Sequence, residues 1–187
     1  MNILKEILCE HLLCRKQLLK LAKVEIVKTY KGAVLGWAWA LIRPAITIFV
    51  YWFAFSIGLR AGKDVEGFPY FFWLISGMIP WFFMRDAFTS GASSLRRHTY
   101  LINKIKFPIC TIPTFVNLSL LLVNMLLIAI MIVLFAIFCY PPTIYYLQIP
   151  IYILMMFLFF NAWGLFAGML GAMSRDFLNL IKSLSMA

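Results

Sequence analysis

The chain has 187 residues, of which 64% are hydrophobic, 17% are aromatic and only 13% are charged. A soluble domain carries roughly 45–50% apolar and about 25% charged residues, so this composition excludes an ordinary soluble globule and indicates a membrane protein. The formal net charge of +10 would suggest a nucleic-acid partner in a soluble protein, but basic residues also gather on the cytoplasmic side of membrane proteins, and we expect no nucleic acid here.

The first predicted elements are amphipathic helices within a cytoplasmic N-terminal region, residues 1–32. Residues 3–12 and 18–31 each place apolar side chains on one helical face, and the lysines of the second stretch lie largely opposite. These faces are formed by Ile3, Leu4, Ile7, Leu8 and Leu12, and by Leu18, Leu19, Ala22, Ile26 and Tyr30. Leu21, Val24 and Val27 interrupt the second pattern. Such a helix either lies along the inner membrane surface, held by apolar burial and anionic lipid, or packs on a protein; its direct continuation into an apolar run favours the membrane surface.

Four apolar segments then follow, each long enough to cross a bilayer, which takes roughly 20 residues. They run from about 33 to 59, 68 to 90, 112 to 138 and 147 to 173, and turn residues such as Gly62, Gly67, Pro141 and Pro142 separate the first from the second and the third from the fourth. The sequence therefore predicts an all-α, polytopic membrane protein with four transmembrane helices in the region 33–173.

The charges flanking these segments predict their orientation. Basic residues precede the first span, separate the second from the third and follow the fourth; they are Lys5, Arg15, Lys16, Lys20, Lys23, Lys28 and Lys31, then Arg96, Arg97, Lys104 and Lys106, then Arg175 and Lys182. In the 60–67 loop the basic residues are balanced by acidic ones, and the 139–146 loop has no charge. We therefore expect a cytoplasmic N-terminus, two short outward loops and a cytoplasmic C-terminal tail.

Arg43 and Pro44 lie inside the first apolar segment, although a charged residue and a helix breaker are unusual in an apolar helix. In the simpler interpretation, Arg43 reaches back to the inner headgroups and anchors the helix. In the functional interpretation, it faces a polar interior and meets an anionic substrate or a partner. Pro44 predicts a kink or a helix start near that point, and Pro80 predicts a kink in the second span.

Few other polar residues occur within the spans. Asn117, Asn124 and Asn161 are predicted to bridge helices by hydrogen bonds, while Arg85 and Asp86 are predicted to pair with other helices. Gly164 and Gly168 have the small-xxx-small spacing that permits close helix packing. The dense aromatic residues toward the outer half of the first two spans suit an interfacial belt, and the alternative is that some of them stack on sugar rings.

The chain closes with a short helix predicted over residues 174–187. Ser174 can cap it and Asp176 falls in its first turn. Phe177, Leu180, Ile181 and Leu184 share a face at helical spacing, so we expect this helix to lie along the inner membrane surface.

The sequence lacks the motifs and residues that would carry several kinds of chemistry. There is no G-x-x-x-x-G-K-[ST] motif for nucleotide phosphates, no evident nucleophile–base set, and no carboxylate or histidine in the middle of a span to carry protons. Cys9, His11 and Cys14 lie close together, but no second ligand pair follows them at zinc-like spacing. We therefore expect no enzyme activity, cofactor or metal, and we expect the energy for any transport to come from another subunit.

The order of these elements resembles a known family. KTYKGAVLGWAWALIRP leads into the first span, and PYFFWLISGMIPWFFMRDAFTSGASSL, LINKIKFPICTIP and GMLGAMSRDF follow in turn. Together they are similar to the permease subunit of bacterial ABC exporters for polysaccharides, namely O-antigen, capsule and teichoic acid. The resemblance covers the whole chain.

The resemblance implies a homodimer bound to a separate ABC ATPase, in a bacterial cytoplasmic membrane, exporting a lipid-linked glycan. It implies a role in coupling to the ATPase for one set of residues: Ser174, Arg175, Asp176, Phe177, Leu180 and Ile181. It implies a substrate path lined by a second set: Arg43, Trp37, Trp52, Phe55, Tyr70 and Trp73. Arg43 would meet the lipid pyrophosphate, because guanidinium geometry suits phosphate.

One departure and two alternatives accompany this interpretation. The family has six spans, so the chain is expected to be truncated after the fourth. A membrane-bound enzyme of lipid or glycan metabolism would need a polar cluster at one interface, for which only Arg85, Asp86, Arg175 and Asp176 are at hand. A structural membrane protein without transport is the other alternative.

Overall fold

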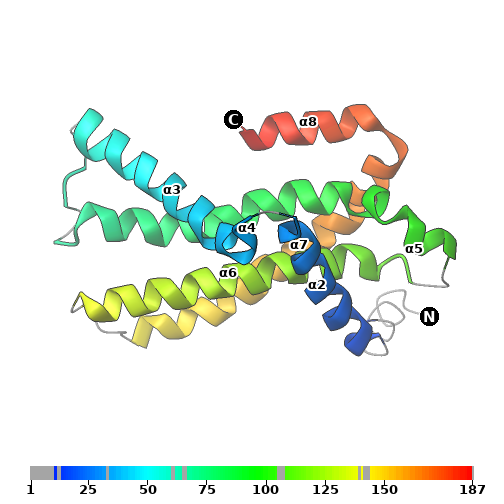
Figure 1. Cartoon of the computed structure of the whole chain (residues 1–187), viewed down its shortest axis with the longest axis horizontal. Coiled ribbons are helices and arrows are strands. Elements are labelled where there is room, and N and C mark those ends of the chain that lie inside the picture. Colours follow the sequence, from blue (N-terminus) through cyan, green and yellow to red (C-terminus); the bar gives the residue numbers. More distant parts are fainter. Residues whose placement is uncertain are drawn as a thin grey trace.

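The computed structural model is a helical bundle (Figure 1) that describes residues 11, 14–32, 34–59, 62–64, 67–104, 108–138, 140 and 144–186. All regular elements in these ranges are helices. In chain order they are α2 (Arg15–Tyr30), the short helix η1 (Gly36–Ala38), α3 (Trp39–Phe53), η2 (Ala54–Gly58), α4 (Tyr70–Arg97), α5 (Thr99–Lys104), α6 (Thr111–Ile137), η3 (Ile144–Leu147), α7 (Gln148–Met173) and α8 (Arg175–Met186). The predicted amphipathic helix at 3–12 lies outside the described residues, apart from His11.

Long helices form at all four predicted segments, but only three of them are apolar enough to cross a membrane on their own. In the described part of the chain these are Gly36–Gly58, Thr111–Ile137 and Ile144–Met173. The predicted count of four is therefore corrected for α4, which is longer than expected and ends at Arg97. The charged pair Arg85–Asp86 and the serine-rich turns that follow lower its hydropathy, because α4 occupies the middle of the bundle rather than its lipid-facing surface. Helix α3 continues through Pro44, and α4 continues through Pro80.

Helix α4 is the hub of the fold, since α3, α6, α7 and α8 all pack against it. Its closest neighbour is α7, and small residues allow that approach. A methyl group added at Gly164 would come within 2.9 Å of the Pro113 side chain on α6, and one added at Gly91 would come within 3.2 Å of the Gly164 backbone. A methyl group added at Gly168 would likewise meet the side chains of Leu95 and Ser94 on α4.

Asparagine side chains join the three central helices in the apolar interior. Asn117 of α6 donates through Nδ2 to the Phe160 carbonyl of α7 at 2.8 Å, and Asn124 donates to the Ile79 carbonyl of α4 at 2.8 Å. Both asparagines bridge helices as predicted. Asn161 accepts a long hydrogen bond through Oδ1 from Asn117 Nδ2 at 3.5 Å, and its own Nδ2 donates to the Phe157 carbonyl of α7.

Helix α2 packs on protein with the face that the sequence singled out. Leu18, Ala22 and Ile26 are buried, and Leu18 and Ala22 join a cluster with the first turns of α6 that includes Ile112 and Phe115. Leu19, however, remains half exposed, on the side away from this cluster. The buried face of α2 therefore turns toward α6 rather than toward a membrane surface.

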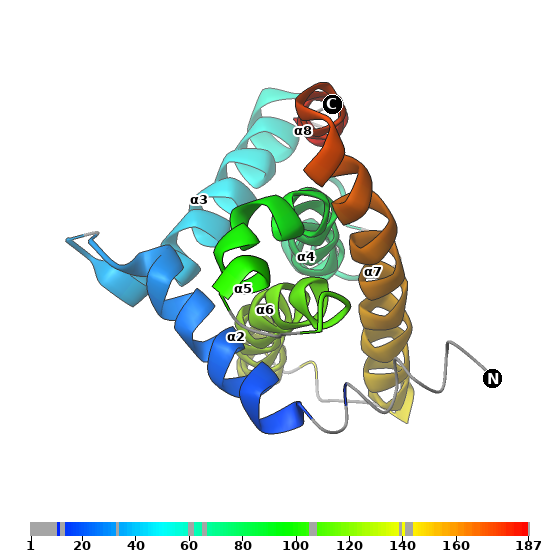
Figure 2. The same ribbon diagram turned by 90° about the vertical axis from the view of Figure 1, so that its right-hand side faces the viewer.

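The amphipathic pattern of α8 led us to expect a helix along the inner membrane surface, and the structure shows which protein surface its apolar face contacts. The helix turns back and runs beside α4 (Figures 1 and 2). Leu178 and Ile181 are buried against Ala92 of α4 and Ala167 of α7, with Phe177 packed beside them. Leu180 and Leu184 are exposed, so the predicted four-residue apolar face divides into a protein-facing and an outward-facing part.

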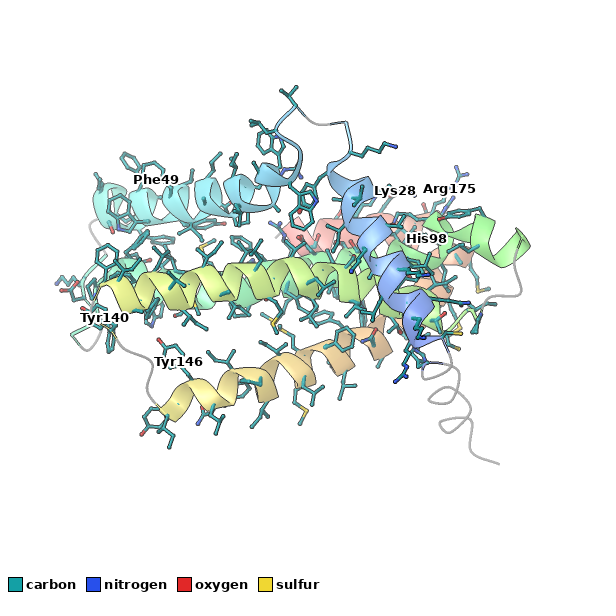
Figure 3. The ribbon with its side chains drawn as sticks, turned by 60° about the horizontal axis from the view of Figure 1, so that its bottom comes forward. Lys28, Phe49, His98, Tyr140, Tyr146 and Arg175 are labelled. Atoms are coloured by element: carbon teal, nitrogen blue, oxygen red, sulfur yellow. The ribbon has the colours of Figure 1, made fainter. Side chains whose placement is uncertain are left out.

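The two ends of the bundle differ in character. At one end, here called the α5 end, lie α2, α5 and the turn between α7 and α8, as Figure 2 shows face on. Lys28, His98 and Arg175 all lie toward this end in Figure 3, whereas Tyr140 and Tyr146 lie at the opposite end, here called the loop end.

Candidate functional site

A cleft of about 250 Å³ lies where α2, α3, α4 and α6 meet. Each helix contributes polar side chains to an otherwise apolar wall. The polar lining residues are Thr29, Tyr30, Arg43, Thr47, Arg85, Asp86 and Asn124. A concave site with a few convergent polar groups in an apolar setting is the usual form of a ligand-binding site.

Two arginines and one carboxylate line this cleft. Arg43 is exposed, and its Cζ lies 5.6 Å from the centre of the Trp39 ring, in cation–π range. Arg85 pairs with its own neighbour, Nη2 to Oδ1 of Asp86 at 3.1 Å. The prediction that these two residues pair with other helices is therefore wrong, since adjacent side chains of α4 satisfy each other.

Asn124 brings a buried acceptor to the wall of the cleft. The residue is 3% exposed, its Nδ2 donates to the Ile79 carbonyl, and its Oδ1 has no hydrogen-bond partner among the described residues. A buried carbonyl oxygen without a donor costs about 1–3 kcal/mol. The Oδ1 atom itself is inaccessible to solvent, so this acceptor lies behind the wall of the cleft rather than on its surface.

Tyr30 forms the α2 wall. Burial raises the pKa of its phenol, an effect that the Arg43 charge opposes and the Asp86 charge reinforces. The hydroxyl therefore stays protonated at neutral pH and can donate a hydrogen bond. The Tyr30 ring lies 6.1 Å from the ring of Trp37, which itself is half exposed just outside the cleft.

From this cleft an exposed face of α4 leads toward the loop end. Arg85, Trp81, Gly77 and Trp73 follow one another at four-residue intervals, and all four are exposed. Trp73 and Trp81 border an open hollow that also includes Ser76 and Gly77. This face carries two large aromatic surfaces, which suit stacking on the apolar faces of sugar rings.

The six residues predicted to line a substrate path do not form one site. Arg43 and Trp37 lie at or beside the cleft. Trp52, Phe55, Tyr70 and Trp73 lie nearer the loop end, where Tyr70 stacks on Trp73 at 5.9 Å and Trp52 meets Phe71 edge-on at 6.1 Å. The exposed α4 face connects the two groups.

The residues predicted to couple the chain to an ATPase also divide. Ser174, Arg175 and Asp176 are exposed at the turn between α7 and α8, and the Phe177 N–H donates to Ser174 Oγ at 3.4 Å, a weak helix cap. Leu180 is exposed farther along α8, whereas Ile181 and Phe177 pack on the bundle.

The sequence analysis missed one polar contact, between Glu25 and His98. His98 Nε2 lies 3.2 Å from Glu25 Oε2 although the residues are 73 positions apart. One signal was available, since Glu25 is the only acidic residue between positions 11 and 63. A lone carboxylate among lysines at a half-buried helix position indicates a specific partner.

Comparisons with known proteins agree with the resemblance. The family model described as ABC-2 type transporter matches residues 16–187. The O-antigen export system permease protein RfbA of Myxococcus xanthus is 29% identical over 102 residues, which are 54% of this chain and 38% of that protein. The protein of the same name from Klebsiella pneumoniae is 30% identical over 84 residues, 45% of this chain and 31% of the relative. The matched part of the chain thus spans well under half the length of these relatives.

Proposed function

Because the chain belongs to the ABC-2 type transporter family, we propose that it is the membrane-embedded permease subunit of an ATP-driven exporter. Its cargo is a lipid-linked polysaccharide or teichoic acid, moved from the cytosol to the cell exterior across a bacterial cytoplasmic membrane. The observation that carries this proposal is the exposed face of α4, which joins a cleft with two arginines to a hollow between two tryptophans.

Each part of that path suits a part of such a cargo. A guanidinium group can donate two parallel hydrogen bonds to the oxygens of one phosphate group. Arg43 of α3 and Arg85 of α4 would therefore hold the lipid-linked diphosphate in the cleft. Trp81 and Trp73 would then offer successive stacking surfaces to the sugars as they pass toward the loop end. Neither aromatic surface selects a particular sugar, which fits a path for a long polymer.

Two partners complete the proposed machine. A second copy of the chain would close the path opposite α4 and cover α3, of which only Ala40 is buried in this fold. An ABC ATPase would dock at the α5 end, on the turn that presents Ser174, Arg175 and Asp176. In this arrangement the N-terminus and α5 face the cytosol, and 33–173 forms the membrane region.

The docking proposal is tested by co-purification of the chain with the ABC ATPase of the same exporter. Arg175→Ala and Asp176→Asn should each lower the amount of ATPase recovered by about tenfold, because a charge-assisted hydrogen bond at an interface is worth about 1.5–3 kcal/mol. Lys182→Gln, a neutral replacement of another exposed cation on α8, is the matched control and should leave recovery unchanged.

The same variants separate docking from folding. Among the described residues, the Arg175 and Asp176 side chains form no hydrogen bond or ion pair with the bundle, and α8 is anchored by Leu178 and Ile181. Their replacement should therefore leave thermal stability intact. Full recovery of ATPase with both variants would exclude this turn as the docking site.

A further inference from the structure

Helix α2 is tied to the α5 end of α4 by a compact polar cluster. Glu25 sits between a histidine and an arginine, with Oε2 at 3.2 Å from His98 Nε2 and Oε1 at 3.8 Å from Arg97 Nη1. One turn later, Lys28 Nζ lies 5.8 Å from the centre of the Tyr100 ring on α5. All three contacts join the same two regions of the chain, one before the first span and one just after the second.

The His98 ring is the buried centre of the cluster. Its side chain is 2% exposed, and its edge-to-face contact with Phe115 of α6 has ring centres 5.0 Å apart. Its second nitrogen, Nδ1, lies 2.9 Å from the Ser94 carbonyl oxygen. Both ring nitrogens therefore face acceptors, a carbonyl on one side and a carboxylate on the other.

This geometry favours one protonation state. A neutral imidazole has a single N–H, so one of the two contacts would bring a lone pair against an acceptor oxygen. The doubly protonated ring donates to both. The groups that act on the ring are Glu25 and Lys28 from α2, Arg97 from α4 and Tyr100 from α5, and α6 contributes only the apolar Phe115.

The carboxylate side of the cluster is ionised at neutral pH. The hydrogen bond from His98 is the main cause that lowers the pKa of Glu25 below its ordinary value of 4.5, with the charges of His98, Arg97 and Lys28 adding to it and burial opposing it. A carboxyl group whose pKa is lowered on folding stabilises the folded state above its ordinary pKa, and that contribution is lost as the pH falls below it. Glu25 therefore keeps its negative charge throughout the neutral pH range.

We infer that Glu25 and His98 form a proton-dependent clasp that holds the last turns of α2 in place, and with them the Tyr30 wall of the cleft. Tyr30 follows Glu25 by less than two helical turns, so a shift of α2 at Glu25 moves Tyr30 with it. When the ring loses its proton, its ion pair with Glu25 is lost and only one of the two ring nitrogens can still donate a hydrogen bond, so α2 loosens. Glu25 and His98 are thus positioning residues for the cleft, whatever ligand the cleft takes.

The test is hydrogen exchange of α2 amides, followed by mass spectrometry on the full chain in lipid nanodiscs from about pH 6 to about pH 9, the range in which a histidine changes charge. Exchange in α7 serves as the internal reference for the intrinsic effect of pH. In the unmodified chain, α2 should be protected at the acid end of this range and should lose protection toward the alkaline end.

Two variants remove the clasp from either side. Glu25→Gln and His98→Gln should each raise α2 exchange at pH 6 by about tenfold, the equivalent of about 1.4 kcal/mol, and should abolish the pH profile. The double variant should be no worse than either single one, because both remove the same interaction. His11→Gln replaces the only other histidine of the chain, which contacts Thr114 rather than Glu25, and should keep the profile.

The outcomes are distinct. The clasp is overturned if the pH dependence of α2 exchange survives in His98→Gln, or if it disappears in His11→Gln. It is also overturned if the increases in α2 exchange caused by Glu25→Gln and His98→Gln are fully additive in the double variant. Should the buried His98 site fail to tolerate glutamine, Glu25→Gln alone decides, because its side chain is only partly buried. The readout requires neither transport nor an ATPase, so it stands or falls separately from the proposed function.

Discussion

At the scale of single residues, the charged groups that border the bundle differ in whether they have a partner within it. Arg85 is neutralised by Asp86, and Glu25 is shared between His98 and Arg97. Arg43 differs, because its one recorded partner is the face of Trp39 and it has no ion pair among the described residues. Its charge is therefore the one in the cleft that is most available to an anion.

Replacing Arg43 tests the binding role against the anchoring role that the sequence also allows. Arg43→Gln should lower polymer export by about tenfold if the guanidinium binds a phosphate group, and Arg43→Lys should recover only part of it, because an ammonium group lacks the planar fork. Export is measured as the ratio of surface polymer to polymer accumulated in the cytosol, at matched protein levels.

A simple anchor predicts a different pattern. Lysine would then restore export fully, since either cation can reach the headgroups. Lys31→Gln, which removes an exposed cation just after α2, controls for the loss of one positive charge and should leave export unchanged.

At the scale of elements, packing between helices depends on where side chains are absent. Gly164 of α7 lies against Gly91 of α4 and Pro113 of α6, so three helices meet around a site with no room for a methyl group. Gly77 lies on the exposed face of α4, and a methyl group added there would meet no atom within 4 Å. Both glycines lie within helices, but Gly164 has no room for a side chain and Gly77 does.

These two glycines form a matched pair. Gly164→Ala should destabilise the chain by about 1–3 kcal/mol through overpacking against Pro113, whereas Gly77→Ala should be neutral or stabilising by up to about 1 kcal/mol, since alanine favours the helix. Unfolding in mixed detergent micelles, followed by circular dichroism, measures both. Equal stability of the two variants would contradict the tight contact between α4 and α7.

The elements also show what a sequence can predict. Helices α6 and α7 begin and end within a residue of their predicted spans, because uninterrupted apolar runs of that length have no other stable structure in a bilayer. Helix α3 is shorter than its predicted span, which it fills only together with the short helices η1 and η2. The length of α4 was underestimated, because its inner half is stabilised by contacts with α7 and α8 rather than by apolar character. The packing of α8 on α4 and α7 was not predicted for a similar reason, since periodicity indicates which residues share a face but not which surface that face meets.

The site was predictable only in part. Arg43 stood out because a charge inside an apolar run is rare, and it does line the cleft. The Asn124 acceptor and the Glu25–His98 contact depend on pairings across helices that are distant in sequence, and no local pattern specifies them. The aromatic residues were recognised as a group, but their division between packing and exposure follows from the rotation of each helix.

At the scale of the whole molecule, charge is distributed unequally between the two ends. The α5 end gathers Arg96, Arg97 and Arg175 together with the basic residues of α2, while the described part of the loop end has Lys63 balanced by Asp64. By the positive-inside rule we propose that the α5 end faces the cytosol.

Single cysteines introduced into a cysteine-free background test this orientation. A membrane-impermeant maleimide should label Asp64→Cys and Tyr145→Cys in intact spheroplasts, and should label Tyr100→Cys and Arg175→Cys only after permeabilisation. All four positions are exposed in the fold, so differences in labelling report sidedness. Labelling of Tyr100→Cys from outside would invert the topology and with it the direction of the proposed export.

The central place of α4 has a consequence for how the chain is made. A charged pair near the middle of a helix raises the cost of releasing it alone into lipid by several kcal/mol, and α4 is not among the three helices apolar enough to do so. The helices that shield it, α6 and α7, are synthesised after it. We therefore expect α4 to wait beside the insertion machinery until they emerge, so that the middle of the bundle enters the bilayer as a group.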